Sequence, residues 1–187
     1  MTKVDVDKRS RLVQTAVKLA YRQGFRKTTL AEIAEDAQVP LGNVYYYFKT
    51  KDEIGEAILE QRLSEFQAQR AKWDRAGTPK ERLQAFVQMT LDNRELLARG
   101  GCPTGTLCAE LHKEGGVLAK KASPLLAEPL AWMEAQFKKL GKGKDSEGLA
   151  VHLLSALQGV SLLAHSFRNP GLVLIEGGRL KEWIRAL

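Results

Sequence analysis

Apolar residues recur every three to four positions along most of the chain, which is the period of α-helices, and no segment alternates between apolar and polar residues as a β-strand does. Glycines and prolines divide this pattern into segments. The first seven residues are polar and are expected to be disordered. The sequence therefore predicts an all-α fold with helices over about 8–23, 30–37, 41–48, 52–73, 79–98, 104–113, 117–140, 146–167 and 172–187, where prolines 124 and 129 kink the 117–140 segment or delay its start.

The stretch Thr28–Lys51 has the pattern of two short helices joined by a tight turn. Thr29 and Glu32 have the spacing of a capping box, which satisfies free backbone N–H groups where a helix starts. Pro40 suits the first turn of a second helix, over about 41–48. Together with the helix over 8–23, this pair predicts a three-helix head with a small core of Leu12, Ala16, Leu19, Phe25, Ile33, Ala34, Val44 and Phe48.

The second helix of the pair has two different faces when it is wound at 3.6 residues per turn. The face expected to pack inward carries Leu41, Val44, Tyr45 and Phe48, and the opposite face carries Gly42, Asn43, Tyr46 and Tyr47. The opposite face has hydroxyls, an amide and no carboxylate, and its glycine allows another backbone to approach. Because such a surface suits phosphates and base edges, the stretch is interpreted as a helix-turn-helix whose second helix recognises DNA.

The charge distribution supports a nucleic-acid partner. The 187 residues carry a net charge of +7, and residues 1–51 hold +5 of it, with ten Lys or Arg against five Asp or Glu. Lys51 lies where a cation beside a helix N-terminus can bind a phosphate. Positive charge on the segment with the helix-turn-helix indicates phosphate binding, although a basic surface without a partner is the alternative.

The run TTLAEIAEDAQVPLGNVYYYFKTKDEI resembles the DNA-binding signature of the TetR/AcrR family of bacterial transcriptional regulators, above all in IAEDA, Gly42 and YYYFKTK. It departs from the family at Gln38, where a turn glycine is usual, and at Pro40, where a serine is frequent. The resemblance implies DNA contacts from Thr28, Thr29, Pro40, Leu41, Gly42, Asn43, Tyr45, Tyr46, Tyr47 and Lys51.

The remainder of the chain is interpreted as a body that binds a small effector and a second subunit, so that residues 1–51 form the DNA-binding domain and residues 52–187 the body. The segments Ser146–Phe167 and Leu172–Leu187 have more apolar surface than one side of a helix can bury in a monomer of this size. In the resembled family the last two helices of each subunit form a four-helix dimer interface, which implies a homodimer; an intramolecular core is the alternative. Several apolar residues are equally suited to the core and to an effector pocket: Phe86, Met89, Trp132, Met133 and Phe137.

Cys102 and Cys108 are the candidates for redox chemistry or effector binding. Cys102 precedes Pro103 at the expected start of a helix, where the helix dipole favours a thiolate. A bond between the two cysteines would require the helix to unwind, so a sensor role would use one thiol or a bond between subunits. The alternative is that both cysteines are small buried apolar residues.

Other functional classes find no support in the sequence. His112, His152 and His165 are scattered without metal-ligand spacing, and no nucleophile motif, phosphate loop or paired carboxylates indicate an enzyme or a cofactor. No apolar stretch approaches the eighteen residues that span a bilayer, and the N-terminus lacks a signal peptide core, so we expect a cytoplasmic protein.

The sequence thus favours a homodimeric repressor that releases a palindromic DNA operator when a small effector binds the body. Two alternatives stay open. One is a thiol-based sensor of electrophiles or oxidants that acts through Cys102 on the same head, and the other is a helical interaction protein that never binds DNA.

Overall fold

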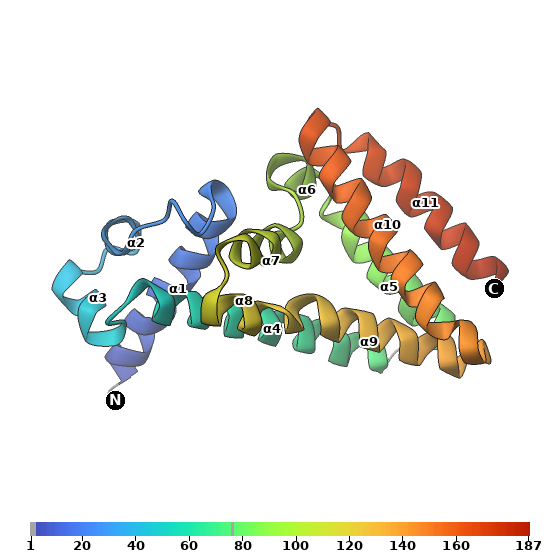
Figure 1. The fold of residues 1–187 in the computed structure, drawn as a ribbon, viewed down its shortest axis with the longest axis horizontal. Coiled ribbons are helices and arrows are strands. Elements are labelled where there is room, and N and C mark those ends of the chain that lie inside the picture. The colour runs from blue at the N-terminus through green and yellow to red at the C-terminus, as the bar shows by residue number, and fades with distance from the viewer. Residues whose placement is uncertain (1–2, 76) are drawn as a thin grey trace. The chain divides into compact units, whose positions relative to one another are not determined.

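A computed structural model describes residues 3–75 and 77–187, and in this part of the chain the fold is all-α, as the sequence predicted (Figure 1). The helices are α1 (Lys3–Gln23), α2 (Leu30–Asp36), α3 (Leu41–Tyr47), α4 (Lys51–Asp74), α5 (Pro79–Asp92), α6 (Arg94–Gly100), α7 (Pro103–Glu114), α8 (Gly116–Ala122), α9 (Pro124–Lys139), a 3₁₀ turn η1 (Gly143–Asp145), α10 (Ser146–Phe167) and α11 (Gly171–Ala186).

Helix boundaries differ from the sequence prediction in three places. The expectation of seven disordered N-terminal residues is wrong for the described ones, because α1 begins at Lys3; residues 1 and 2 lie outside the described residues. The single helix predicted over 79–98 is two helices, which meet at Asn93. The Asn93 side chain donates a hydrogen bond to the Met89 carbonyl at 2.7 Å, and such local bonds compete with a regular helix. The segment predicted over 117–140 is also two helices, because α8 ends at Ala122 and Pro124 starts α9. Pro124 therefore interrupts the segment rather than delaying its start, while Pro129 lies inside α9.

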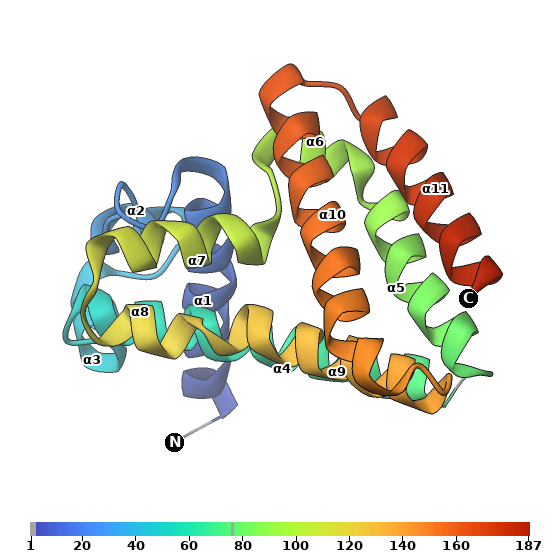
Figure 2. The same ribbon diagram turned by 45° about the vertical axis from the view of Figure 1, so that its right-hand side comes forward.

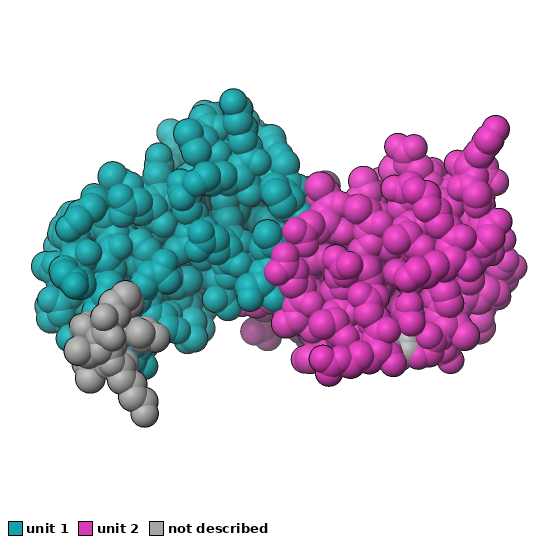
Figure 3. All heavy atoms as spheres, turned by 90° about the horizontal axis from the view of Figure 1, so that it is seen from below, with its two compact units in different colours: residues 1–64, 106–125 teal, residues 65–105, 126–187 magenta. Residues whose placement is uncertain are grey.

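The chain divides into two compact units (Figure 3). The first contains the residues up to 64 together with 106–125, and the second contains 65–105 and 126–187. Helices α4, α7 and α9 each contribute residues to both units. The first unit therefore holds the predicted three-helix head and also most of α7 and all of α8.

The core of the first unit is the one predicted from the apolar spacing. All eight residues assigned to the head core are buried. Ile54 and Ile58 of α4 are buried as well. Gly55 lies so close to its neighbours that a Cβ atom there would approach Phe25 to 2.8 Å and Leu118 to 2.9 Å. The start of α4 is thus tightly packed in this unit.

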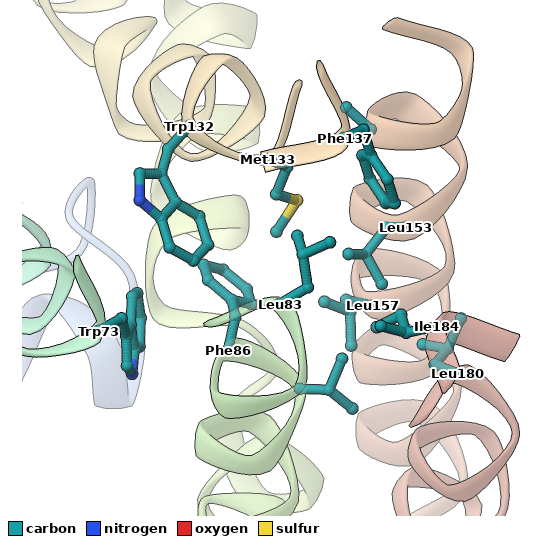
Figure 4. Packing of buried hydrophobic residues seen from close by; sticks show 12 residues of the cluster. Trp73, Leu83, Phe86, Trp132, Met133, Phe137, Leu153, Leu157, Leu180 and Ile184 are labelled. Carbon is teal, nitrogen blue, oxygen red and sulfur yellow. The ribbon is translucent and has the colours of Figure 1, made fainter. Parts of the chain in front are cut away.

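The core of the second unit is built from α5, α9, α10 and α11, together with Trp73 at the end of α4 (Figure 4). Figures 1 and 2 both show α5, α10 and α11 running side by side, and Figure 4 shows side chains of α9 pointing toward Leu83 and Phe86 of α5. The indole N–H of Trp132 donates to the Asp74 carboxylate at 2.9 Å. Of the residues considered for both core and pocket, four are buried in this cluster and Met89 is partly buried against it: Phe86, Trp132, Met133 and Phe137.

One apolar helix departs from the sequence expectation. Within the described residues, the segment Gly143–Phe167 is long and apolar enough to cross a bilayer by length and composition, so the statement that no stretch approaches this limit was wrong. The observation is weak evidence for a membrane span, since a core helix passes the same test. Leu153, Leu157 and Ala164 of this helix pack in the interior of the second unit.

Candidate nucleic-acid interface

The start of α2 is fixed by the predicted capping box. The Thr29 hydroxyl accepts the Glu32 backbone N–H at 3.2 Å, and the Glu32 carboxylate accepts the Thr29 backbone N–H at 2.8 Å. The hydrogen bond from the Thr29 backbone is the main cause that lowers the pKa of Glu32 below its ordinary value. The box stays formed while Glu32 is ionised, so it holds α2 in place near neutral pH.

The turn between α2 and α3 depends on Gln38. Its φ of 53° lies in the left-handed region, which glycine adopts at lower cost than other residues. The Arg11 guanidinium donates to the carbonyls of Ala37 and Gln38, and these bonds support the turn from α1. Pro40, with a φ of −54°, then precedes α3 as its N-cap residue. The position that departs from the family pattern therefore still adopts the backbone shape for which glycine is suited.

The exposed face of α3 differs from the one predicted. Val44 and Phe48 are buried as expected, but Leu41 and Tyr45, which were assigned to the inward face, are 41% and 47% exposed. The reason is that the core contacts only a narrow stripe of this short helix. The α3 face, as we name the exposed surface, consists of Leu41, Gly42, Tyr45 and Tyr46, which are one or three to five positions apart.

Two residues of the α3 face define its chemistry. Tyr46 is 66% exposed, and its ring meets the edge of the half-buried Tyr47 ring at a centroid distance of 5.0 Å. No atom lies within 4 Å of the position where a Cβ atom of Gly42 would stand. Asn43 is half-buried at the side of the face. The α3 face is thus an open surface with aromatic, hydroxyl and aliphatic groups.

The residues predicted at the start of α2 are less suited to contact a partner. Thr28 is 1% exposed and its hydroxyl donates to the Gly24 carbonyl at 2.8 Å, so the structure contradicts a DNA contact from this side chain. It is buried because it closes the turn after α1. Thr29 is exposed, but its hydroxyl serves the capping box.

Lys51 binds the loop between α1 and α2 in the first unit. Its Nζ donates to the Arg26 carbonyl at 2.6 Å and lies 4.9 Å from the centre of the Phe25 ring. Two hydrogen bonds cap the start of α4: the Thr50 hydroxyl accepts the Glu53 N–H at 3.2 Å, and the Glu53 carboxylate accepts the Lys49 N–H at 2.7 Å. A carboxylate therefore stands at the start of α4, where a phosphate was expected.

Glu110 of α7 is a functional candidate that the sequence did not indicate. Its carboxylate accepts the backbone N–H groups of Phe25 and Arg26 at 2.9 and 2.8 Å. These two N–H groups belong to the loop whose Arg26 carbonyl binds Lys51. No sequence signal could have shown this contact, because the partners are more than eighty residues apart.

Comparison with known proteins identifies this helix pair. Residues 12–58, which include α2 and α3, match the family described as bacterial regulatory proteins, tetR family. Residues 12–58 therefore belong to the TetR family, and α2 and α3 are its helix-turn-helix. TetR-family regulators bind DNA operators.

A relative in sequence is the HTH-type transcriptional repressor NemR of Escherichia coli (strain K12), which is 31% identical over 110 residues, or 58% of this chain and 54% of NemR. In sequence, the chain thus spans about half the length of the curated relatives it matches. The structure of reduced E. coli NemR shares the fold, with a TM-score of 0.79 and 22% identity over 94% of this chain and 96% of NemR. SCO4454 of Streptomyces coelicolor, a TetR-family regulator, has a TM-score of 0.83 and 19% identity over 97% and 96% of the two chains.

The two cysteines of the chain lie in different surroundings, and neither is in a disulfide. Cys108 is buried and its Sγ donates to the Ala122 carbonyl at 3.2 Å, as expected for a core residue. Cys102 is half-buried, and its Sγ accepts the Gly105 N–H and the Gln158 side-chain N–H, each at 3.4 Å. The Cys102 sulfur thus accepts hydrogen bonds from two elements, whereas the Cys108 thiol donates one.

A second exposed apolar surface belongs to the second unit. The α10–α11 face, as we name it, consists of outward side chains from both helices, among them Leu162, Leu163, Phe167, Leu174 and Ile175. Gly159 and Gly178 lie on the same surface and are open. Within the described residues, no group of three His, Cys, Asp or Glu side chains is placed to hold a metal ion.

Proposed function

We propose that this chain is a TetR-family repressor that binds a palindromic operator through the α3 face. The open α3 face carries the proposal, because a recognition helix must present side chains that its own core does not use. The charge of +5 on residues 1–51 supports it, since phosphate contacts supply much of the affinity for DNA. The relative NemR is named as a repressor.

The repressor is a homodimer that forms through the α10–α11 face. Leu162 and Phe167 of α10 are among the most exposed large apolar side chains of the described residues, and Ile175 of α11 is 57% exposed. Large exposed apolar patches are unusual on monomers and mark interfaces. Two-fold symmetry also suits DNA, because one recognition helix covers only a half-site and a dimer covers a palindrome.

The effector is a small molecule that binds the body and favours an arrangement in which the two heads no longer match the half-sites. It can shift DNA occupancy only by its difference in affinity between the two arrangements. Residues 1–51 are the DNA-binding domain and residues 52–187 the effector and dimerisation domain, and the protein acts in the cytoplasm. Since α4, α7 and α9 each contribute to both compact units, they are the segments through which a change in the body would reach the head.

The test is to select bound sequences from a randomised duplex library and to measure affinity for the selected and an unrelated duplex at several salt concentrations. We expect a palindrome, bound by a whole number of dimers and preferred by at least about a thousandfold over the unrelated duplex. Equally weak binding to all duplexes, lost with modest salt, would leave only electrostatic attraction and would favour the helical interaction protein instead.

A second candidate function is a thiol sensor in which modification of Cys102 releases the operator. The hydrogen bonds that the Cys102 sulfur accepts from Gly105 and Gln158 favour it, and a relative was solved in a form described as reduced. Treatment with N-ethylmaleimide distinguishes it from non-covalent sensing. If the thiol is the sensor, the wild type and Cys108→Ser release DNA whereas Cys102→Ser does not; release that is independent of Cys102 would exclude this mechanism.

A further inference from the structure

The composition of the α3 face indicates which base pairs it can recognise, provided that the chain binds DNA as proposed. Helix α3 has the sequence LGNVYYY, without Arg, Lys or Gln. The strongest direct contact to guanine is a bidentate pair from Arg or Lys to its N7 and O6 atoms. The helix that is presented to the major groove has no side chain that can make this contact.

The first part of the α3 face instead offers apolar carbon atoms. Leu41 has only apolar atoms and is 41% exposed at the first position of α3, and Tyr45 lies one turn later with its ring 47% exposed. The N-terminal residues of a recognition helix reach the base edges. The apolar feature in the major groove is the C5-methyl group of thymine. Leu41 and Tyr45 therefore match thymine and no other base.

The amides near these side chains select the same base pair. Asn43 lies at the side of the α3 face, and Gln38 is exposed in the turn before α3. Asn and Gln pair with the N6 and N7 atoms of adenine, the partner of thymine. Along the chain the nearest cation is Lys49, which follows the far end of α3, where a side chain meets the phosphates rather than the base edges. The Arg11 guanidinium near the turn already donates to the carbonyls of Ala37 and Gln38.

We propose that α3 recognises A·T base pairs in each half-site through thymine methyl groups, with Leu41 and Tyr45 as the side chains that contact them. The contact excludes a C·G pair at these positions because cytosine has no methyl group to bury. The specificity of this regulator then rests on apolar contacts and amides, while the basic residues supply affinity that is independent of sequence.

The test uses the duplex selected from the library, resynthesised with deoxyuridine in place of one thymidine at a time. Deoxyuridine lacks only the methyl group. At one or two positions in each half-site we expect the affinity to fall about fourfold, the value for one buried methyl group. Replacing the same T·A pair by 5-methylcytosine·G, which keeps the methyl group, should bind more tightly than replacing it by C·G.

Variants of the protein distinguish a direct contact with the thymine methyl group from an effect of that methyl group on DNA shape. At one such position, Leu41→Ala or Tyr45→Ala should bind the thymidine and deoxyuridine duplexes equally, because the contact is already lost. The same loss in the wild type and in both variants would assign the effect to DNA shape and overturn the proposal. The proposal would also be overturned if deoxyuridine had no effect at any position, although the repressor function would then stand. If no duplex were selected from the library, both the repressor function and this proposal would be overturned.

Discussion

The α3 face and the α10–α11 face are both exposed and apolar, but their side chains differ in chemistry. Two of the three large side chains of the α3 face are tyrosines, whose hydroxyl groups can bond to phosphates or water. The large exposed side chains of the α10–α11 face are aliphatic residues and one phenylalanine, without a polar atom. The first kind of surface suits a hydrated, charged partner, and the second suits burial against another protein.

The charges around the two faces support the same assignment of partners. Residues 1–51 have ten Lys or Arg against five Asp or Glu, whereas residues 146–187 have four against three. Exposed apolar side chains alone therefore do not identify a partner. The polar atoms among them and the charge around them do, and on these grounds we assign the α3 face to DNA and the α10–α11 face to a second subunit.

The largest expected effect comes from placing a charge in the α10–α11 face. Leu162→Glu should raise the dissociation constant of the dimer by about a hundredfold or more. The reason is that one carboxylate from each subunit would be buried in the interface, which costs about 3 kcal/mol or more. Sedimentation equilibrium measures it. The matched control is Val117→Glu in α8, since both side chains are 63% exposed. A dimer unaffected by Leu162→Glu, or weakened equally by Val117→Glu, would refute this interface.

A smaller effect is expected from one methyl group on the α3 face. Gly42→Ala should raise the free energy of unfolding by about 0.5–1 kcal/mol, since alanine favours a helix, and no atom opposes its Cβ. It should nevertheless lower operator affinity by about tenfold, because overpacking a close contact costs about 1–3 kcal/mol. Gly148→Ala in α10 also has open space and should stabilise without changing DNA binding. If Gly42→Ala binds the operator as tightly as the wild type, Gly42 is not part of the DNA interface.

The two capping boxes provide a comparison of the units themselves. Thr29→Ala in the first unit and Thr78→Ala in the second each remove a complete box and should lower the free energy of unfolding by about 1 kcal/mol. Only Thr29→Ala should also weaken DNA binding, because α2 positions α3. Urea unfolding and fluorescence anisotropy with labelled operator give the two quantities. Equal loss of DNA binding in both variants would mean that the boxes do not act locally.

The smallest effect is on the pH dependence of stability. Backbone hydrogen bonds from Thr29 and Thr78 lower the pKa of Glu32 and Glu81 below 4.5. Burial raises the pKa of Asp74, but bonds from Trp132 and Arg70 outweigh it and the net shift is downward. These contributions are present above the unfolded pKa and are lost as pH falls through the folded one. The free energy of unfolding should therefore decline as the pH falls below about 4.5, and it should decline less steeply in Glu81→Gln. An equally steep decline in this variant would show that Glu81 does not contribute to the pH dependence.

Local patterns in the sequence predicted much of the fold. The box at Thr29 and Glu32 and the core of the head both follow from residues close together in the chain, and the structure confirms them. The second complete box, at Thr78 and Glu81, has the same spacing and could have been found in the same way.

The candidate site was less predictable, because it depends on contacts between distant segments. The helical period correctly predicted that Val44 and Phe48 point into the core. Only the packing of the folded chain shows that the core is too narrow to cover Leu41 and Tyr45. The burial of Thr28 depends on its bond to Gly24 in the folded turn. Glu110 binds a loop more than eighty residues earlier, and no local pattern contains that information.

The most direct test of the assignment compares duplexes with two half-sites, one half-site and none, using the wild type, Tyr46→Ala and Leu162→Glu. We predict that Leu162→Glu loses the preference for two half-sites over one but still prefers one half-site over none. Tyr46→Ala should weaken the preference for one half-site over none while remaining a dimer. If Tyr46→Ala keeps that preference in full, or if Leu162→Glu keeps the preference for two half-sites, the assignment of the two faces is wrong.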